Sequence, residues 1–407
     1  MPERLGLIIT AKLRVAHQVR AARAIIRGVG MASLSIGIDY RPALSRSTGV
    51  GRYVSGLVGA LARLDRQNDY VLFSSSLRER VERGSFPSNF QVVDRHIPVS
   101  LLNTLWHRLG TPRLEALAGR SFDISHSPHP LILPSRGRTV VTIHDLFFYR
   151  HSQGTTAEIR RDYAPLVKSH ASRADAIVTP SLTTKEEVVR WLGVDERKIQ
   201  VTPLGIDPEA FRPRPGEEEE LAERYRLPPR YVLAVASLEP RKNLSRLVEA
   251  VGLLVGRGWD GTLLIAGGSD RDESRIARAI EGQRLGGRVR RLGYVPFQHL
   301  PAIYRRARVL ANVSLWEGFG LPVLEAMACQ VPVVASDIPS HHEVAAEGAF
   351  YVDADRSDSI AQGIERVWED EPLRKKLIEQ TQKRLALFSW DETARRTLAL
   401  YERLGPK

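Results

Sequence analysis

The chain has 407 residues, of which 43% are hydrophobic and 26% are charged. This composition is ordinary for a globular protein and excludes a largely disordered or fibrous chain. No apolar stretch approaches the roughly 20 residues that a membrane-spanning helix needs. The single cysteine, Cys329, excludes an internal disulfide and a cysteine-based zinc site. At roughly 100–200 residues per domain, the length predicts two domains or a few.

The net charge of +12 is confined to the first half of the chain. Residues 1–200 contain 29 Lys and Arg against 17 Asp and Glu, whereas residues 201–407 contain 30 of each kind. Such an excess predicts an anionic partner for the first half, such as a membrane surface, a phosphorylated substrate or nucleic acid; an arginine-rich solvated surface is the alternative. Because no nucleic-acid-binding module is recognisable, nucleic acid is not expected as the partner.

Residues 1–32 differ from the sequence that follows them. The first 30 contain six basic residues and one acidic residue, with apolar residues between them. They lack the long apolar core and small-residue cleavage pattern of a secretory signal. Two interpretations are open: a basic amphipathic helix on an anionic membrane, or a basic extension upstream of a true start at Met31. We favour the extension, outside the fold, because Met31 leads directly into the first predicted strand.

From residue 34, short apolar strands alternate with helical patterns. The predicted helices include residues 50–64, 156–172 and 244–256. Continuously apolar, β-branched strands separated by helices are typical of parallel sheets covered on both faces. The strands are predicted at residues 35–39, 70–73, 91–95, 124–126, 139–143, 176–179, 199–202, 231–235, 262–266, 289–292, 309–311, 331–335 and 349–352.

A segment rich in Gly and Pro, from Gly205 to Gly216, is followed by four glutamates and predicts a linker at residues 208–220. It separates residues 33–207 from residues 221–407. Each part is predicted to be a doubly wound, Rossmann-like α/β domain with a parallel sheet. The two domains are expected to face each other across a central cleft, where ligands of such sheets bind.

Two motifs follow predicted strands in the first domain. Thr48-Gly-Val-Gly-Arg-Tyr53 is a glycine turn, with Gly49 and Gly51, that leads into a helix. It does not fit the dinucleotide-binding fingerprint, because the third glycine of that pattern is missing. It does not fit a phosphate-binding loop either, because it lacks the sequence Gly-Lys-Ser/Thr. Three histidines also lie near strand ends. A zinc site is disfavoured because no His-Glu-x-x-His helix accompanies them and cysteine ligands are absent; hydrogen-bonded structural histidines are the alternative. These histidines are His126, His129 and His144.

Two further motifs follow strands in the second domain. Arg241 and Lys242 come after a Ser237-Leu-Glu-Pro turn and open a helix, where adjacent cations can neutralise a diphosphate; a solvated surface is the alternative. In Glu317-Gly-Phe-Gly-Leu-Pro-Val-Leu-Glu325, the glycines permit a tight turn beside a ligand, and the proline suits the first turn of a helix. The two glutamates could hold successive parts of one polar ligand, although each alone is better explained as a turn or capping residue.

The string from Glu317 to Ser336 resembles the donor-site signature of retaining glycosyltransferases of family 4, which have the GT-B fold. The resemblance extends over most of residues 34–400. It includes residues 204–207, 236–243, 263–268 and 388–390. Two departures are visible, because Gln330 stands where a glycine is usual and Val313 where a proline is usual.

The resemblance implies a role for each motif. Glu325 would hold the ribose of a nucleotide sugar, and Glu317 would hold hydroxyls of its sugar. Arg241 and Lys242 would stabilise the leaving diphosphate. His144 would donate a hydrogen bond to the donor sugar beside the anomeric carbon. The remaining donor-binding residues implied are the glycine turn that covers the phosphates (Gly49, Gly51), the cleft-lining His129, the turn residue Ser237, and the amides of Gly318, Phe319, Gly320 and Leu321. The matching segment includes His126 as a cleft residue.

The sequence therefore predicts a retaining hexosyltransferase that needs no metal ion, since no Asp-x-Asp motif lies in the donor region. Its similarity to bacterial mannosyltransferases of polysaccharide assembly suggests GDP-mannose as donor and a glycan or lipid-linked glycan as acceptor. We expect a cytoplasmic enzyme, peripheral on the inner face of the membrane. The alternatives are a GT-B sugar phosphorylase or sugar-phosphate synthase with a soluble acceptor, and a non-catalytic nucleotide-binding protein.

Overall fold

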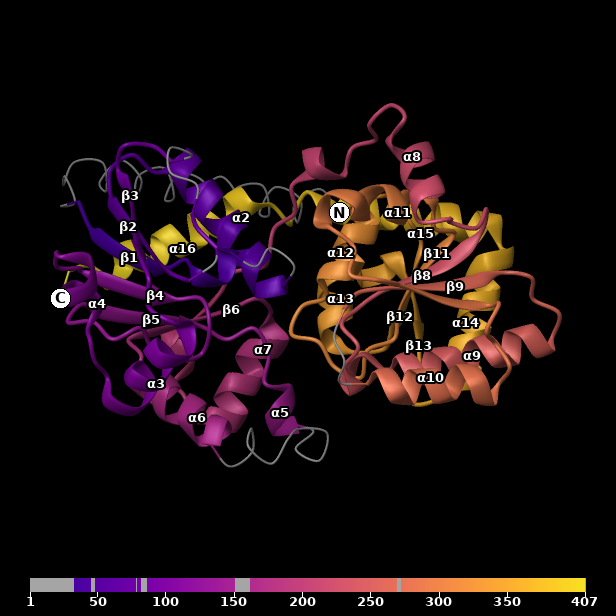
Figure 1. Cartoon of the computed structure of the whole chain (residues 1–407), viewed down its shortest axis with the longest axis horizontal. Helices are drawn as coiled ribbons and strands as arrows, with labels where there is room; N and C mark the ends of the chain where they lie inside the picture. Colours follow the sequence, from indigo (N-terminus) through magenta and orange to yellow (C-terminus); the bar gives the residue numbers. More distant parts are fainter. Residues whose placement is uncertain are drawn as a thin grey trace, which may run out of the picture.

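The computed structural model describes residues 33–44, 48–77, 79–81, 86–150, 162–268 and 272–406. These residues form two α/β domains that lie side by side along the long axis of the molecule (Figure 1). The predicted extension at residues 1–32 lies outside the described residues, as does the first part of the helix predicted at residues 156–172. Among the helices of the described ranges, none is long and apolar enough to cross a membrane.

The first domain is built on a seven-stranded parallel sheet of order β3-β2-β1-β4-β5-β6-β7. Its strands are β1 (Ser35–Asp39), β2 (Asp69–Ser75), β3 (Phe90–Arg95), β4 (Ile124–Ser127), β5 (Arg138–Thr142), β6 (Ala176–Thr179) and β7 (Ile199–Val201). Its helices are α2 (Gly49–Leu64), α3 (Val99–Leu109), α4 (Leu114–Ala118), α5 (Phe147–Arg150), α6 (Ala164–Arg173) and α7 (Leu182–Glu187).

The second domain has a six-stranded parallel sheet of order β10-β9-β8-β11-β12-β13. Its strands are β8 (Tyr231–Val235), β9 (Thr262–Ala266), β10 (Val289–Gly293), β11 (Val309–Asn312), β12 (Val333–Ser336) and β13 (Ala349–Val352). Its helices are α8 (Glu217–Arg224), α9 (Leu244–Gly256), α10 (Glu273–Gly282), α11 (Leu300–Arg306), α12 (Leu321–Ala328), α13 (Pro339–Ala345), α14 (Ser357–Glu369) and α15 (Glu371–Leu385).

The strand order in both sheets places the key loops next to one another. In each sheet the order reverses beside the first strand, between β1 and β4 in one domain and between β8 and β11 in the other. Ligands of doubly wound sheets bind at this reversal, at the carboxyl ends of the strands. The loops that follow β8 and β11 carry the Arg241 and Glu317 motifs, so the topology brings these two motifs together.

The predicted doubly wound fold is confirmed, and each predicted strand is present with its ends within two residues of the prediction. One shifted end has a clear cause. Strand β12 was predicted from residue 331 but begins at Val333, because Pro332 has no N–H to donate to the ladder and offers only its carbonyl, which accepts from Leu310. The predicted linker also contains structure, since the four glutamates form the first turn of α8, where the helix dipole favours acidic side chains.

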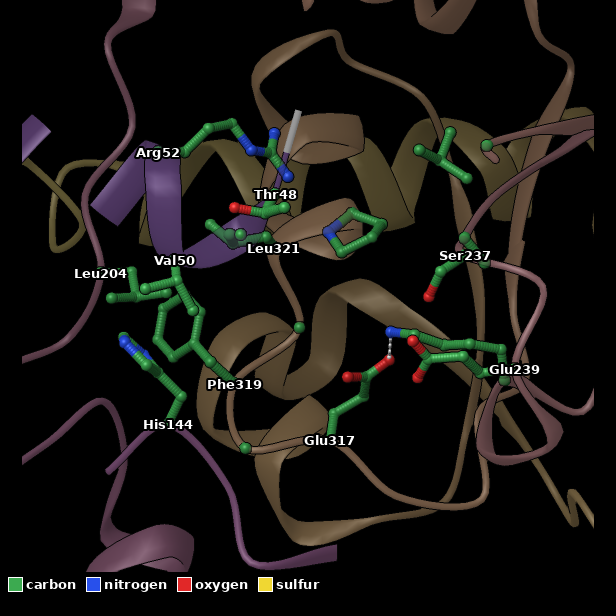
Figure 2. Close-up of a pocket in the computed structure, with 18 of the residues that line it drawn as sticks. Thr48, Val50, Arg52, His144, Leu204, Ser237, Glu239, Glu317, Phe319 and Leu321 are labelled. Carbon is green, nitrogen blue, oxygen red and sulfur yellow. Dashed lines mark hydrogen bonds and ion pairs between the residues drawn. The ribbon is translucent and has the colours of Figure 1, made fainter. Parts of the chain in front are cut away.

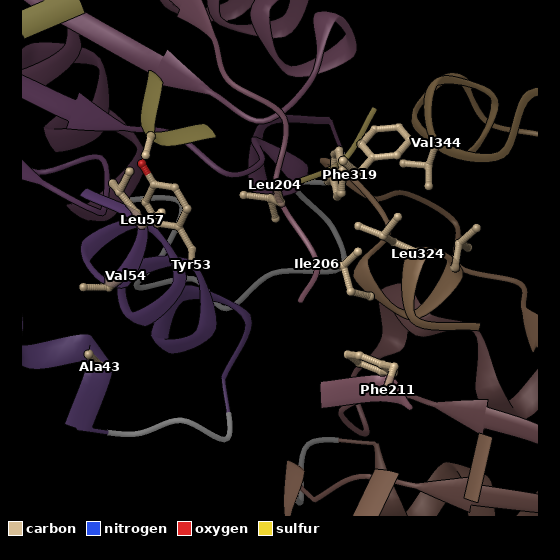
Figure 3. Packing of buried hydrophobic residues seen from close by; sticks show 14 of the residues in the cluster. Ala43, Tyr53, Val54, Leu57, Leu204, Ile206, Phe211, Phe319, Leu324 and Val344 are labelled. Atoms are coloured by element: carbon tan, nitrogen blue, oxygen red, sulfur yellow. The ribbon is translucent and has the colours of Figure 1, made fainter. Parts of the chain in front are cut away.

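The chain passes between the domains at two adjacent segments. The N–H of Ile206 donates to the carbonyl of Phe388 at 3.1 Å, and Ile206 forms a parallel bridge with Ser389. After this crossing, α16 (Trp390–Leu404) returns to the first domain and lies against α2 (Figure 1). Buried Leu204 and Ile206 pack between the hydrophobic residues of the two domains (Figure 3). This apolar contact fixes how the two sheets face each other.

Candidate active site

A cavity of about 760 Å³ lies between the domains, at the carboxyl ends of strands from both sheets (Figure 2). The first domain contributes the glycine turn and His144, and the second contributes the turns after β8, β9 and β11. The predicted site residues that line it are Gly49, His144, Ser237, Arg241, Lys242, Glu317, Gly318, Phe319, Gly320 and Leu321.

Glu317 is the buried acid at the centre of this cavity. Its carboxylate accepts from the guanidinium of Arg241 at 2.9 Å and from the ammonium of Lys242. The hydroxyl of Ser314 also donates to it, at 2.7 Å. Burial alone would raise the pKa of Glu317, but the charges of Lys242 and Arg241 outweigh it and hold the pKa well below its usual range. Glu317 is therefore ionised, and its two cations face the cavity with it.

The turn that carries the cations is itself tied to the loop that carries Glu317. A short 3₁₀ helix, Pro240–Lys242, is followed by Asn243 in the left-handed conformation, at φ +58°. The Asn243 side chain donates to the carbonyls of Val313 and Ala354, at 3.2 and 2.7 Å. The carbonyl of Arg241 accepts from the N–H of Leu315 at 2.8 Å. Asparagine tolerates this conformation better than most residues, so its position here fixes both functional loops.

The loop from Glu317 to Leu321 approaches the first domain closely. Gly318 lies against the backbone of His144, where a β-carbon would clash with the carbonyl. Gly320 adopts φ +111°, which favours glycine, and starts α12 with Pro322 in its first turn. Glu317 precedes this helix and Glu325 lies within it, so the two glutamates do not share one helix face. The loop instead places Glu317 and Glu325 in different parts of the interdomain space.

His144 is partly buried and packs edge-on against Tyr53, with 4.9 Å between ring centroids. Its Nε2 lies 3.0 Å from the carbonyl of Pro128. Since a carbonyl only accepts, Nε2 carries the proton and donates it. Burial lowers the pKa of His144, which favours the neutral ring. In that tautomer Nδ1 is an acceptor. The sequence predicted His144 as a donor to the sugar; this geometry makes it a hydrogen-bond acceptor instead.

The glycine turn begins helix α2. The Thr48 hydroxyl caps the helix by accepting from the N–H of Gly51 at 3.0 Å. The Gly51 N–H is therefore directed at Thr48, and Gly51 is not among the residues that line the cavity. Gly49 does line the cavity, beside Leu321. Arg52, in the same turn, reaches across to the second domain and forms an ion pair with Glu325.

Glu325 is 2% exposed and lies on α12. One of its oxygens pairs with Arg52, and the other accepts from the hydroxyl of Tyr304 at 2.8 Å. Glu325 lines an adjoining cavity of about 610 Å³ rather than the central one, and Arg52 lies between the two cavities because it lines both. A ligand of Glu325 therefore competes with Arg52 and Tyr304 for the carboxylate.

Sequence comparisons cover both domains of the chain. The family model described as Glycosyltransferase Family 4 matches residues 47–210, and the model described as Glycosyl transferases group 1 matches residues 217–384. Together the two models cover most of the chain, one in each domain, and the chain is a glycosyltransferase. Among its relatives is the O-antigen chain mannosyltransferase B of Escherichia coli, 28% identical over 88% of this chain and 96% of the relative. Another is the O-antigen chain mannosyltransferase RfbU of Salmonella typhimurium, 29% identical over 60% of this chain and 63% of the relative.

Solved structures share the fold of this glycosyltransferase. The sucrose-phosphate synthase of Thermosynechococcus elongatus superposes with a TM-score of 0.74, at 21% identity over 91% of this chain and 99% of that one. HepE of Anabaena, in complex with UDP and glucose, superposes with a TM-score of 0.68, at 16% identity over 90% of this chain and 99% of that one. The predicted GT-B architecture is confirmed by these likenesses.

Two of the histidines do not line the central cavity of the glycosyltransferase. His129 lies outside it, with Nε2 3.3 Å from a carboxylate oxygen of Asp39. His126 lies within β4 and is fully buried, hydrogen-bonded to Tyr401 and Thr142 at 2.6 and 2.9 Å. The interpretation of His126 as a cleft residue is wrong, because side chains alternate along a strand and this one points into the core between α2 and α16.

Sequence reasoning missed several residues that shape the site. Arg52 was inside a recognised motif, and its charge was the available signal. Tyr304 and Ser314 had no such signal, because each is an ordinary residue until the fold brings it to a glutamate.

Within the described residues, no group of three or more His, Cys, Asp or Glu is placed to hold a metal ion.

Proposed function

We propose that this glycosyltransferase moves a mannosyl residue from GDP-mannose to a glycan or lipid-linked glycan, with retention of configuration and without a metal ion. The observation that carries the proposal is the partly buried Arg241–Lys242 pair in an interdomain cavity, held by buried Glu317. Two relatives with this chemistry in their names, both O-antigen mannosyltransferases, support the choice of sugar. HepE was solved with UDP and glucose, which supports a nucleotide-sugar donor in this fold.

In this proposal the chemical step is driven by charge stabilisation. As the bond to the anomeric carbon breaks, negative charge grows on the departing diphosphate, and Arg241 and Lys242 neutralise it. Glu317 keeps these cations in place before the donor binds and accepts hydrogen bonds from hydroxyls of the sugar. The carboxylate of Glu317 is already engaged by two cations and Ser314, which makes it a poor nucleophile. We therefore assign retention to attack on the face that the diphosphate leaves, with the diphosphate taking the acceptor proton.

The donor is tested by the thermal unfolding of the full chain with GDP-mannose, UDP-glucose or ADP-glucose. A donor at about 100 times its Kd stabilises the folded state by about 2.7 kcal/mol. We expect the largest rise in Tm with GDP-mannose, and an α-linked product by NMR when an acceptor is supplied. A rise with UDP-glucose alone would replace the mannosyl assignment, and no rise with any of the three would overturn the proposal.

Metal independence gives a separate prediction. Because two protein cations already face the diphosphate position, we expect turnover to change less than twofold when EDTA is added. Initial rates in EDTA, with and without added manganese, measure this. Complete loss in EDTA that manganese restores would show that a metal ion shares the charge stabilisation.

The location of the acceptor gives a prediction about membranes. Basic residues near an anionic bilayer contribute roughly 1 kcal/mol each, within a Debye length of the surface. Residues 31–200 keep a net charge of +7 without the first 30 residues. We expect both the full chain and a chain shortened to begin at Met31 to sediment with phosphatidylglycerol vesicles at low salt and to leave them at high salt. If only the shortened chain fails to bind, residues 1–30 are a membrane anchor; if neither binds, the acceptor is soluble.

A further inference from the structure

A carboxylate of the second domain caps a helix of the first. Glu343, on α13, accepts from the backbone N–H groups of Leu182 and Thr183, both at 2.7 Å, and from the Thr183 hydroxyl. These two amides belong to the first turn of α7, where N–H groups have no partner within the helix. A carboxylate at this end also interacts favourably with the helix dipole. The contact joins residues 160 positions apart in the sequence and crosses the domain interface.

The same turn of α7 also contacts the loop that carries Glu317. The hydroxyls of Ser181 and Thr184 donate to the carbonyl oxygen of Gly318, at 2.6 and 3.1 Å. Both side chains are at most 2% exposed, so water does not compete freely for these hydrogen bonds. Gly318 is also where a β-carbon would collide with the backbone of His144. The first domain therefore holds the Gly318 peptide group by direct contact on two sides.

Holding this carbonyl also orients the next N–H. The peptide bond is planar and trans, so the N–H of Phe319 points opposite to the carbonyl of Gly318. With that carbonyl fixed on α7, the N–H of Phe319 points away from α7. Phe319 and Gly318 both line the central cavity. A backbone N–H is useful to a leaving diphosphate or a sugar hydroxyl only if it is already aimed there before the reaction.

We propose that Glu343 is a positioning residue for transfer. By capping α7 across the interface, Glu343 holds Ser181 and Thr184 against the Gly318 carbonyl, and this fixes the direction of the Phe319 N–H. The proposed series of contacts runs from Glu343 to α7, from α7 to the Gly318 peptide, and from that peptide to the donor. This assignment rests on the proposed function of the cavity and adds to it a specific link between the domain interface and the donor loop.

Steady-state kinetics with GDP-mannose test the link, using Glu343→Ala, Glu343→Asp and Ser181→Ala/Thr184→Val. We expect Glu343→Ala to lower kcat by tenfold or more, with the donor Kd from thermal shifts changing less than threefold, because Glu325 and the cation pair remain. Glu343→Asp should recover part of the loss. Glu347→Ala is the control and should behave as wild type, because Glu347 is an exposed carboxylate in the short 3₁₀ helix, Ala346–Gly348, that follows α13.

The combination of variants separates positioning from mere support of the fold. If Glu343 acts through Ser181 and Thr184, the triple variant Glu343→Ala/Ser181→Ala/Thr184→Val should be no slower than the slower parent, since coupled residues are not additive. Losses that multiply, or a kcat for Glu343→Ala within twofold of wild type, would overturn the proposal.

Hydrogen exchange provides a readout that does not depend on the identity of the donor. We expect the amides of Leu182 and Thr183, which lose their acceptor, and of Leu324, which donates to the Gly320 carbonyl of the loop, to exchange at least tenfold faster in Glu343→Ala, with no such change in Glu347→Ala. Unchanged protection of Leu324 would break the link between the cap and the loop. If the wild type ignores every nucleotide sugar, the proposed function fails, whereas the exchange data still decide whether Glu343 orders this loop.

Discussion

The double variant Arg241→Ala/Lys242→Ala should lose about 10³-fold or more in kcat. Removing one preorganised group that stabilises transition-state charge costs roughly 10²–10³ in kcat, and two cations are removed here. Donor binding should fall less than turnover, because the interaction strengthens as the diphosphate leaves. Single-turnover rates at saturating GDP-mannose measure the chemical step directly.

This variant needs a control because it also removes both cations that pair with the buried carboxylate of Glu317 and leaves only Ser314 as its partner. Losing them leaves the charge of Glu317 unpaired, which costs stability, so folding should be checked by circular dichroism and Tm. Arg246→Ala is the matched variant: Arg246 lies a few residues further on, binds Asp355 and the carbonyl of Ala354, and does not line the cavity. It should retain full activity. A folded double variant with wild-type turnover would remove the cation pair from the mechanism.

The fold could be predicted well because its signals are local. Continuously apolar runs such as Tyr231–Val235 are buried on both faces of a parallel sheet, and few other structures fit them. Gly and Pro in the loop from Glu317 marked the start of α12 because their effects are also local: glycine permits the φ of +111° at Gly320, and proline fixes the φ of Pro322 in the first turn. The four glutamates at residues 217–220 were misjudged because an acidic run is equally compatible with a solvated linker and with the first turn of a helix.

The site was less predictable because its contacts are not local. Nothing in the spacing of Arg52 and Glu325, 273 positions apart, indicates that they pair, and the same holds for Glu343 and α7. These contacts depend on how the two domains meet, which is fixed by the packing around Ile206 and Trp390. His126 failed for a different reason. Its motif is adjacent to the cleft, but the alternation of side chains along β4 directs the His126 side chain into the core, away from the cleft.

The second large effect is expected at Glu325. Hydrogen bonds from ribose hydroxyls to a carboxylate are worth about 1.5–3 kcal/mol, so Glu325→Ala should raise the Kd for GDP-mannose roughly 10- to 150-fold. In the structure this carboxylate pairs with Arg52 and accepts a hydrogen bond from Tyr304. If Glu325 holds the ribose as the family resemblance implies, the ribose competes with Arg52, and the free energy of that ion pair opposes donor binding.

Because of this competition, substitutions of Arg52 and Glu325 should change the Kd for GDP-mannose in opposite directions. Arg52→Ala should lower the Kd for GDP-mannose a few-fold, because Glu325 no longer has to leave its partner before binding the ribose. Tyr304→Phe removes only one hydroxyl and keeps the ring in place, so it serves as the milder control. Isothermal titration of the three variants tests the order. If Arg52→Ala instead weakens binding as strongly as Glu325→Ala, Arg52 is a donor ligand that turns from the carboxylate to the phosphates when the nucleotide sugar enters.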